Sequence, residues 1–358
     1  MRHRAGCDVA RSPLESVTES DGGGAIRAVL RTTDGVRIEA RYEPRAAREA
    51  PGAPGSAPGP GPGSAPDSGP GSLAVVLAHG FTGSLDRPAL RRAAAAFRQY
   101  AAVITFSFRG HGRSGGRSTV GDREVLDLAA AVGWARALGH SRVATVGFSM
   151  GGSVVVRHAA LYRPEGADGY GESVEGAPEH GGRTGARTPS NTTATATATG
   201  TGAAATGIAG EAADAAVAVS APARWYYNGT APMRRLHWAV QRPLGRLVAR
   251  HALRTRIHPE DWDPVPLPPV AAAPLIAPTP LLVVHGDRDP YFPLDHPRSL
   301  AEAAGPETAE LWLVPGFGHA ENAAEPALLD RVGAWILSTG APAARARRHH
   351  GTRKAADG

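Results

Sequence analysis

The feature that most constrains this fold is a tight turn between an apolar segment and a helical one. Residues 143–146 are strand-like, residues 147–151 read Gly-Phe-Ser-Met-Gly, and an apolar helical segment begins at Ser153. A serine at such a turn sits in a strained backbone conformation, and glycines two residues before and after it let the strand and helix pack closely. The free N–H groups of the helix N-terminus point to the same place, where an oxyanion would be stabilised. The pattern predicts that Ser149 is a nucleophile.

Apolar segments alternate with helical ones along the rest of the chain. A hairpin turning at Asp34-Gly35 is expected first, and the further strands are expected at residues 73–77, 103–108, 215–220, 281–284 and 310–314. The expected helices cover residues 87–100, 122–138 and 326–337. Such alternation is typical of a mostly parallel sheet with right-handed crossovers and helices on both faces. The sequence therefore predicts the α/β class.

Biased composition indicates how the chain is divided. We expect a disordered leader over residues 1–24, a single domain over 25–338, and a basic disordered tail over 339–358. Within the domain, the Pro/Gly-rich residues 44–72 are expected to form a tether, and residues 163–212 a low-complexity insertion. Segments of this composition cannot bury enough apolar surface to offset the entropy of ordering them.

Composition also limits the partners. The net charge is +6, but only one of the 39 Lys and Arg residues is lysine, which indicates biased residue usage more than a nucleic-acid surface. Cys7 is the only cysteine, so no internal disulfide can form, and no apolar run reaches the roughly 18 residues of a membrane span. We expect a soluble, cytoplasmic protein with no nucleic-acid partner and no stable membrane insertion. Peripheral membrane contact and the oligomeric state stay open.

Two polar residues after later strands complete a possible catalytic set with Ser149. Asp289 follows the strand over residues 281–284, and His319 follows the strand over residues 310–314. Ligands of an open parallel sheet bind beyond the carboxyl ends of its strands. A serine hydroxyl needs an imidazole to accept its proton, and a carboxylate to hold that imidazole in one tautomer. Asp287 competes for the acid role, and we favour Asp289 because Pro290 and the residues after it would fix its carboxylate.

An oxyanion hole requires two N–H donors near the nucleophile. Met150, the residue after Ser149, is one candidate donor, and Phe81, in the loop after the strand over residues 73–77, is the other. Three further polar residues lie in loops at the same edge of the sheet. We expect structural roles for them, bracing and tying loops together: His79, His111 and Arg109.

Together these motifs resemble the α/β-hydrolase superfamily. The segments that carry the resemblance are Gly147–Gly151, His79–Gly83, Arg109–Gly112, His285–Asp289 and Gly318-His319. Within the superfamily, the chain is similar to bacterial serine hydrolases of the esterase, lysophospholipase and serine-aminopeptidase kind. The resemblance implies an eight-stranded, mostly parallel sheet, a serine triad, a small-molecule acyl substrate and no cofactor. It leaves open ester, thioester or amide hydrolysis, acyl transfer to another acceptor, and a catalytically silent binding protein.

Proteins of this kind carry a cap where residues 221–280 lie in this chain. Residues 232–253 have an apolar stripe that predicts helix, broken at Pro243, whereas residues 264–280 are too proline-rich for a helix. Residues 215–258 contain no acidic residue but eight arginines. A basic roof would repel the α-ammonium of an aminopeptidase substrate. If the cap is functional, its apolar stripe with flanking arginines suits an acyl chain with an anionic or phosphate head group, or docking at an anionic membrane surface. We therefore expect a medium-chain acyl ester to be cleaved faster than an amino-acid arylamide.

Two alternatives to that interpretation of the cap stay open. Glu260, Asp261 and Asp263 lie just beyond the acid-free stretch, so a peptidase is not excluded. Biased residue usage could also fill a solvated face with arginine. If the cap arginines act on substrate, we expect Arg234 and Arg235 to contact an anionic head group.

Overall fold

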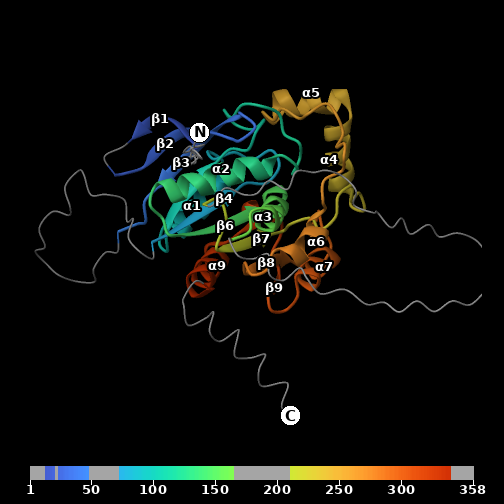
Figure 1. Ribbon diagram of the computed structural model, residues 1–358. Coiled ribbons are helices and arrows are strands. Elements are labelled where there is room, and N and C mark those ends of the chain that lie inside the picture. The colour runs from blue at the N-terminus through green and yellow to red at the C-terminus, as the bar shows by residue number, and fades with distance from the viewer. Residues whose placement is uncertain (1–12, 21–22, 48–71, 165–209, 340–358) are drawn as a thin grey trace, which may run out of the picture.

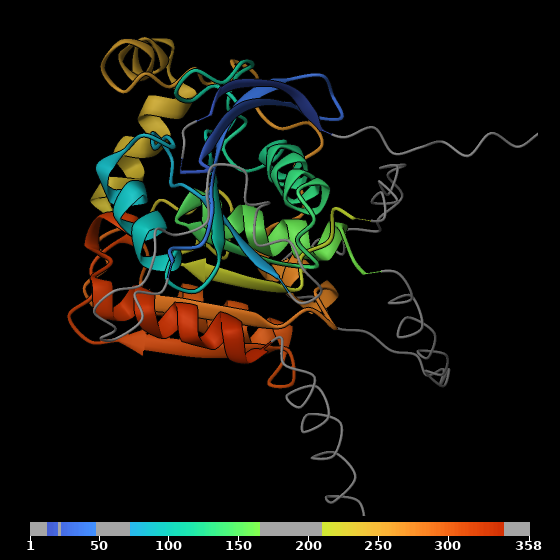
Figure 2. The ribbon, with the colours of Figure 1, turned by 90° about the vertical axis from the view of Figure 1, so that its left-hand side faces the viewer.

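The sheet that forms the centre of the molecule has nine strands and is mostly parallel. The computed structural model describes residues 13–20, 23–47, 72–164 and 210–339. In spatial order the sheet runs β1-β2-β3-β5-β4-β6-β7-β8-β9, with antiparallel pairing from β1 to β5 and parallel pairing beyond (Figures 1 and 2). The strands are β1 (Leu14–Ser20), β2 (Ile26–Arg31), β3 (Arg37–Glu43), β4 (Leu73–Ala78), β5 (Ala102–Phe106), β6 (Arg142–Phe148), β7 (Ala215–Val219), β8 (Leu281–Gly286) and β9 (Ala309–Val314).

Helices cover both faces of this sheet, which explains why its central strands are apolar throughout. Every residue of β4, β5, β7 and β8 is buried. Helices α2 (Glu124–Ala137) and α3 (Met150–Leu161) pack on one face, together with α7 (Asp295–Ala304). On the other face lie α1 (Pro88–Phe97), α8 (Ala320–Ala323) and α9 (Pro326–Thr339). Figure 1 shows α2 and α3 on the opposite side of the sheet from α9.

The predicted cap lies over the carboxyl ends of the strands as two helices and an extended segment. Helices α4 (Ala231–Gln241) and α5 (Pro243–Ala252) are separated at Pro243, which confirms the predicted break. The cap returns to the body beside the loop between β5 and α2, where Ser118 and Ile257 form a parallel bridge. The Ser118 N–H donates to the Arg256 carbonyl at 2.7 Å, and the His258 N–H donates to the Ser118 carbonyl at 2.8 Å. This bridge ties the cap to the loop between β5 and α2.

Several boundaries differ from the sequence predictions. The predicted leader over residues 1–24 contains β1, so the sheet has nine strands rather than eight. β1 is an edge strand whose side chains are mostly solvated, so it lacks the apolar alternation that reveals a strand. The proline-rich segment predicted to be non-helical contains α6 (Pro269–Ala272) and a 3₁₀ turn, Ala273–Leu275, because proline is tolerated in the first turn of a helix. Helix α3 begins at Met150, directly after Ser149.

Most of the low-complexity residues fall outside the described chain. Of the predicted tether (44–72), insertion (163–212) and tail (339–358), the structure describes only residues 44–47, 72, 163–164, 210–212 and 339. The predicted domain boundaries otherwise stay predictions.

Candidate active site

Ser149 lies at the turn between β6 and α3, in the conformation that the motif predicts. Its φ of 51° and ψ of −114° fall outside the favoured regions for a non-glycine residue. The neighbouring glycines make room for the turn: a Cβ on Gly147 would lie 2.0 Å from the Gly151 carbonyl oxygen, and a Cβ on Gly151 would lie 2.3 Å from the Ala78 carbonyl oxygen. The strain is therefore held by backbone packing that tolerates only glycine at these two positions.

A chain of hydrogen bonds links Ser149 to the two residues predicted to act with it. His319 Nε2 lies 2.9 Å from Ser149 Oγ, and His319 Nδ1 lies 2.7 Å from Asp289 Oδ2. The three residues come from segments after β6, β8 and β9, which lie in the same parallel half of the sheet with β7 between β6 and β8. The Tyr291 ring packs against one side of the His319 imidazole, with a centroid distance of 4.3 Å and an interplanar angle of 32°.

Asp289 is enclosed and fully hydrogen-bonded as an anion. Its side chain is 0% exposed, and its Oδ1 accepts hydrogen bonds from the N–H groups of Tyr291 at 2.8 Å and Phe292 at 3.1 Å. Burial acts to raise the pKa of Asp289, but the hydrogen bond and charge of His319 outweigh it, so this pKa lies below its ordinary value. The competing Asp287 is exposed and accepts the Gly316 N–H at 2.6 Å.

The two predicted oxyanion-hole residues border the same pocket as Ser149. Phe81 and Met150 both line it, and a Cβ built on Gly80 would lie 3.4 Å from the Ser149 Cβ. The Gly80 N–H donates to Glu321 Oε1 at 3.0 Å. This bond holds the His79–Gly80 peptide group, one peptide before that of the Phe81 N–H, against α8.

Two histidines brace this loop through both ring nitrogens. The Phe108 N–H donates to His79 Nε2 at 3.0 Å, which leaves His79 Nδ1 as the donor to the Gly80 carbonyl at 2.7 Å. The Thr82 N–H likewise donates to His111 Nε2 at 3.3 Å, and His111 Nδ1 donates to the Arg109 carbonyl. Burial lowers the pKa of both imidazoles, most strongly that of His79, and keeps them neutral. These contacts confirm their predicted bracing roles.

Arg109 joins two elements, as predicted. It is buried and donates to Asp127 on α2 and to Asp34 in the turn between β2 and β3.

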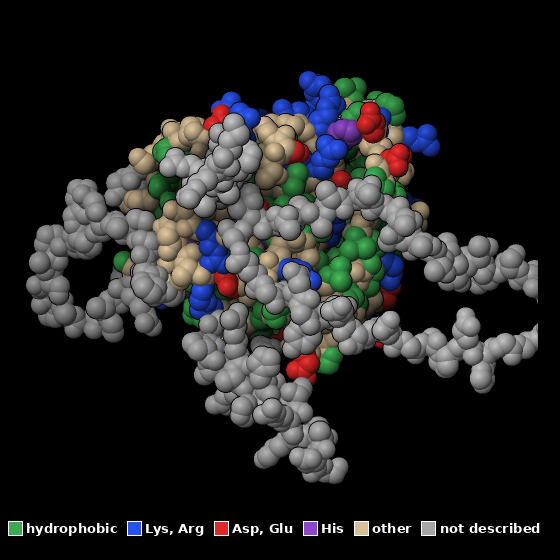
Figure 3. Space-filling view, in the orientation of Figure 1, with side chains coloured by type: hydrophobic (Ala, Val, Ile, Leu, Met, Phe, Trp, Pro, Cys, Tyr) green, Lys and Arg blue, Asp and Glu red, His purple; other side chains and the backbone are tan. Residues whose placement is uncertain are grey.

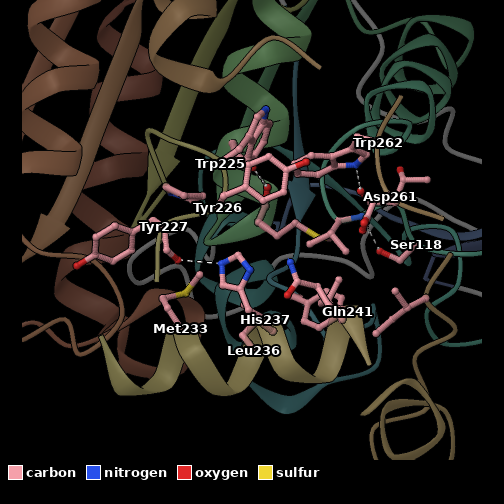
Figure 4. A pocket seen from close by; sticks show the side chains of 18 of the residues that line it. Ser118, Trp225, Tyr226, Tyr227, Met233, Leu236, His237, Gln241, Asp261 and Trp262 are labelled. Carbon is pink, nitrogen blue, oxygen red and sulfur yellow. Dashed lines mark hydrogen bonds between the residues drawn. The ribbon is translucent and has the colours of Figure 1, made fainter. Parts of the chain in front are cut away.

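A pocket of about 130 Å³ opens above Ser149, between the cap and the body. Figure 4 shows α4 along one side of it and the side chains of Trp225, Tyr226 and Trp262 along the other. Met233 and Leu236 of α4 also line it. The pocket is therefore mostly apolar, and the Ser149 hydroxyl lies in its wall.

The cap residues divide between this pocket and the outer surface. Of the predicted apolar stripe, Met233, Leu236 and Val240 line the pocket, whereas Leu244 and Leu247 are 62% and 52% exposed. Arginine and apolar side chains gather together on the outside of α4 and α5 (Figure 3).

The structure places Arg234 and Arg235, which were expected to contact an anionic head group if the cap acts on substrate, outside the pocket. Both are exposed and neither lines the pocket; Arg234 donates to the carbonyls of Asn228 and Gly229, which lie just before α4. The arginines that do line the pocket are Arg224 and Arg246. Arg246 donates to carbonyls at the C-terminal end of α4, a position that helix residue spacing could not reveal.

Three residues that shape the site were not predicted from the sequence: Glu321, Trp225 and Trp262. Only the run of three aromatic residues at 225–227 could have drawn attention to this part of the pocket, since tertiary contacts alone define the other positions.

Two kinds of feature were looked for among the described residues: a cluster of metal ligands and a membrane-spanning helix. Within them, no three His, Cys, Asp or Glu side chains are grouped so that they could hold a metal ion. In the same part of the chain, no helix has the length and apolar character needed to cross a membrane.

Comparisons with known proteins agree with this fold. The family model described as the alpha/beta hydrolase family matches residues 75–331. The esterase Pf2001 of Pyrococcus furiosus superposes with a TM-score of 0.53 at 18% identity, over 94% of this chain and 98% of that one. The α/β hydrolase GrgF of Penicillium sp. sh18 superposes with a TM-score of 0.51 at 15% identity, over 87% and 97%. At such low sequence identities these superpositions show a shared fold and nothing more. No curated protein sequence matches the chain.

Proposed function

This chain belongs to the alpha/beta hydrolase family, and on that premise we propose that it is a serine hydrolase that cleaves carboxylic esters through an acyl-enzyme. The single observation that supports this most strongly is the unbroken hydrogen-bond chain from Ser149 through His319 to Asp289 at an apolar pocket. The proposed catalytic residues are Ser149, His319 and Asp289. The proposed oxyanion-hole donors are the N–H groups of Phe81 and Met150.

In the proposed reaction, Ser149 Oγ attacks the ester carbonyl carbon while its proton moves to His319 Nε2. Asp289 holds the other ring nitrogen and stabilises the imidazolium that forms. The Phe81 and Met150 N–H groups donate to the oxyanion. His319 then protonates the leaving alcohol, the C–O bond breaks, and the acyl group stays on Ser149. Water attacks this acyl-enzyme with His319 as the base, which releases the acid and restores the serine.

The turnover test is hydrolysis of p-nitrophenyl esters from acetate to octanoate by the wild type and by Ser149→Ala. Since the three residues act as a unit, loss of the serine should lower kcat by about a million-fold. A medium-chain or shorter ester should be the better substrate because the pocket is small. A Ser149→Ala enzyme that keeps a tenth of the wild-type activity would overturn the assignment.

A second candidate, a serine aminopeptidase, is favoured by one observation. Glu260 and Asp261 line the pocket, where their carboxylates could pair with an α-ammonium group. Arg224 and Arg246 line it too and oppose that binding. We therefore expect faster cleavage of an acyl ester than of an amino-acid arylamide. The reverse order would favour the peptidase.

The remaining alternatives use the same residues or none of them. Acyl transfer would proceed through the same acyl-enzyme and would be revealed by a mixed ester product when an alcohol is added. A silent binding protein would give no turnover with any acyl substrate. We also propose a cytoplasmic location, which is supported only by the single cysteine.

A further inference from the structure

One wall of the pocket is a continuous aromatic surface. The rings of Trp225 and Trp262 lie 5.0 Å apart between centroids, and those of Tyr226 and Trp262 lie 5.4 Å apart. Figure 4 shows the three side chains side by side, facing α4 across the pocket. Trp225 and Trp262 are 37 positions apart in the sequence, so the fold of the cap assembles this surface.

Hydrogen bonds fix both indoles in place. Trp225 Nε1 donates to the Pro266 carbonyl at 2.8 Å, and Trp262 Nε1 donates to the Thr119 carbonyl at 2.7 Å. The edge of Trp225 also lies against Gly121, where an added Cβ would come within 3.3 Å of the ring. With their N–H groups bonded to backbone, the indoles offer the pocket their apolar carbon surface. A wall that is already ordered costs less entropy when a ligand binds.

The opposite wall, α4, combines apolar side chains with two polar ones. Leu236 and Val240 are apolar, and His237 and Gln241 are polar; all four line the pocket. His237 Nε2 donates a hydrogen bond to the Tyr227 carbonyl oxygen at 2.9 Å, which fixes the orientation of the ring in the pocket wall. A ligand between the two walls would contact aromatic rings on one side, and the aliphatic side chains of Leu236 and Val240 with the polar groups of His237 and Gln241 on the other.

The size of the pocket limits what can fill it. Its volume is about 130 Å³. An engineered protein cavity of about 150 Å³ binds one benzene molecule, so a single six-membered ring suits a space of this size. A long acyl chain would extend beyond it.

From this geometry we propose that the pocket selects ester substrates that carry a planar aromatic ring, either in the acyl group or in the alcohol. This inference rests on the proposed serine hydrolase activity. An aromatic ring against Trp225 and Trp262 gains offset-stacked or edge-to-face contacts in addition to buried area, whereas a saturated ring of nearly equal size gains mainly the area.

The test uses two pairs of esters that differ only in the ring. Methyl 3-phenylpropanoate is compared with methyl 3-cyclohexylpropanoate, and 2-phenylethyl acetate with 2-cyclohexylethyl acetate. We expect kcat/KM to favour the phenyl member of at least one pair by about 3- to 10-fold. The pair that shows the preference tells whether the ring belongs to the acyl group or to the alcohol. A preference for cyclohexyl, or equal rates, in both pairs would overturn the inference.

Variants assign the preference to the aromatic wall. Trp225→Leu and Trp262→Leu should each lower the phenyl-to-cyclohexyl ratio toward one. Trp262→Phe keeps a ring and should keep the preference, which covers the case in which leucine disturbs folding. Trp238→Leu is the matched control, because Trp238 lies on α4, is 46% exposed and does not line the pocket. An unchanged ratio in both leucine variants would overturn the inference.

Failure of the inference and failure of the proposed function give different results. Reaction of Ser149 with a small fluorophosphonate probe reports the nucleophile whatever the substrate preference. A labelled enzyme that hydrolyses both members of each pair equally keeps the proposed function and contradicts the aromatic selectivity.

Discussion

Asp289 and Asp287 differ by two positions, yet only one of them meets the imidazole. Asp289 Oδ2 lies 2.7 Å from His319 Nδ1, whereas Asp287 accepts the Gly316 N–H at the surface. We predict that Asp289→Asn lowers kcat about ten-thousand-fold. The amide can donate to His319 Nδ1, which favours the tautomer with its proton on Nε2, and this nitrogen can then no longer accept the Ser149 proton. Asp287→Asn, the matched control, should retain most of the activity. Steady-state kinetics on one ester decide the matter, and a greater loss at Asp287 would contradict the assignment.

The positions of polar residues after the strands predicted which side chains come together, but not which side chains line the pocket around them. Ser149, Asp289 and His319 could be identified because each follows an apolar strand and parallel strands end at one edge. The aromatic wall could not be identified in this way. Trp225 and Trp262 donate to the backbone carbonyls of Pro266 and Thr119. Every residue type has such a carbonyl, so the sequence does not show which ones accept these hydrogen bonds.

Among the elements, the loop between β5 and α2 connects the cap to the site, and Glu124 organises it. The buried Glu124 carboxylate accepts hydrogen bonds from the hydroxyls of Ser118 and Thr119 and from the N–H groups of Thr119 and Gly121, at 2.7 to 2.9 Å. Ser118 forms the bridge to the cap, and the Thr119 carbonyl holds Trp262. Glu124 therefore supports one wall of the pocket without lining it.

We predict that Glu124→Gln destabilises the protein and raises KM together. The new amide group would face two hydrogen-bond donors, and each buried donor left without a partner costs about 1–3 kcal/mol. Thermal unfolding and ester kinetics check both effects. Glu302→Gln, at an exposed position on α7, is the control. A variant with wild-type Tm and KM would show that the loop does not depend on this carboxylate.

Helices and strands could be predicted from the sequence where one or both of their faces are apolar. The central strands and the α4–α5 break at Pro243 follow from such patterns. Edge strand β1 was not predicted, because only Leu14 and Val17 are apolar in it and it is ordered by pairing with β2. Helix α7 was not predicted, although its buried residues include Leu300.

For the molecule as a whole, buried neutral histidines should make stability depend on pH. Burial is the main cause of a lowered pKa at five of them: His79, His111, His158, His285 and His296. The pKa of His158 falls to about 3. Once unfolded, each histidine titrates near pH 6.5. Below that pH the unfolded chain binds protons that the folded chain cannot, so stability is complete above pH 6.5 and falls as the solution is acidified.

His158 offers a direct test of this linkage. It is buried, and its ring stacks on Tyr162 with a centroid distance of 4.6 Å. Phenylalanine keeps a flat ring at this position but cannot bind a proton. Between pH 7.5 and 5.0, His158 should account for a loss of about 2 kcal/mol in the free energy of unfolding. Urea unfolding should show that His158→Phe loses less stability over this range than the wild type. His251→Gln, at an exposed position, is the control. Equal losses in the wild type and His158→Phe would refute the linkage.

If Ser149 is a nucleophile activated by His319, covalent labelling should detect it without any choice of substrate. The wild type is treated with a fluorophosphonate, and intact mass and peptide mapping locate the adduct. We expect one adduct per chain, on Ser149, with none on Ser149→Ala and much slower labelling of His319→Ala. A folded wild type that stays unlabelled, or an adduct on another residue, would contradict this role of Ser149.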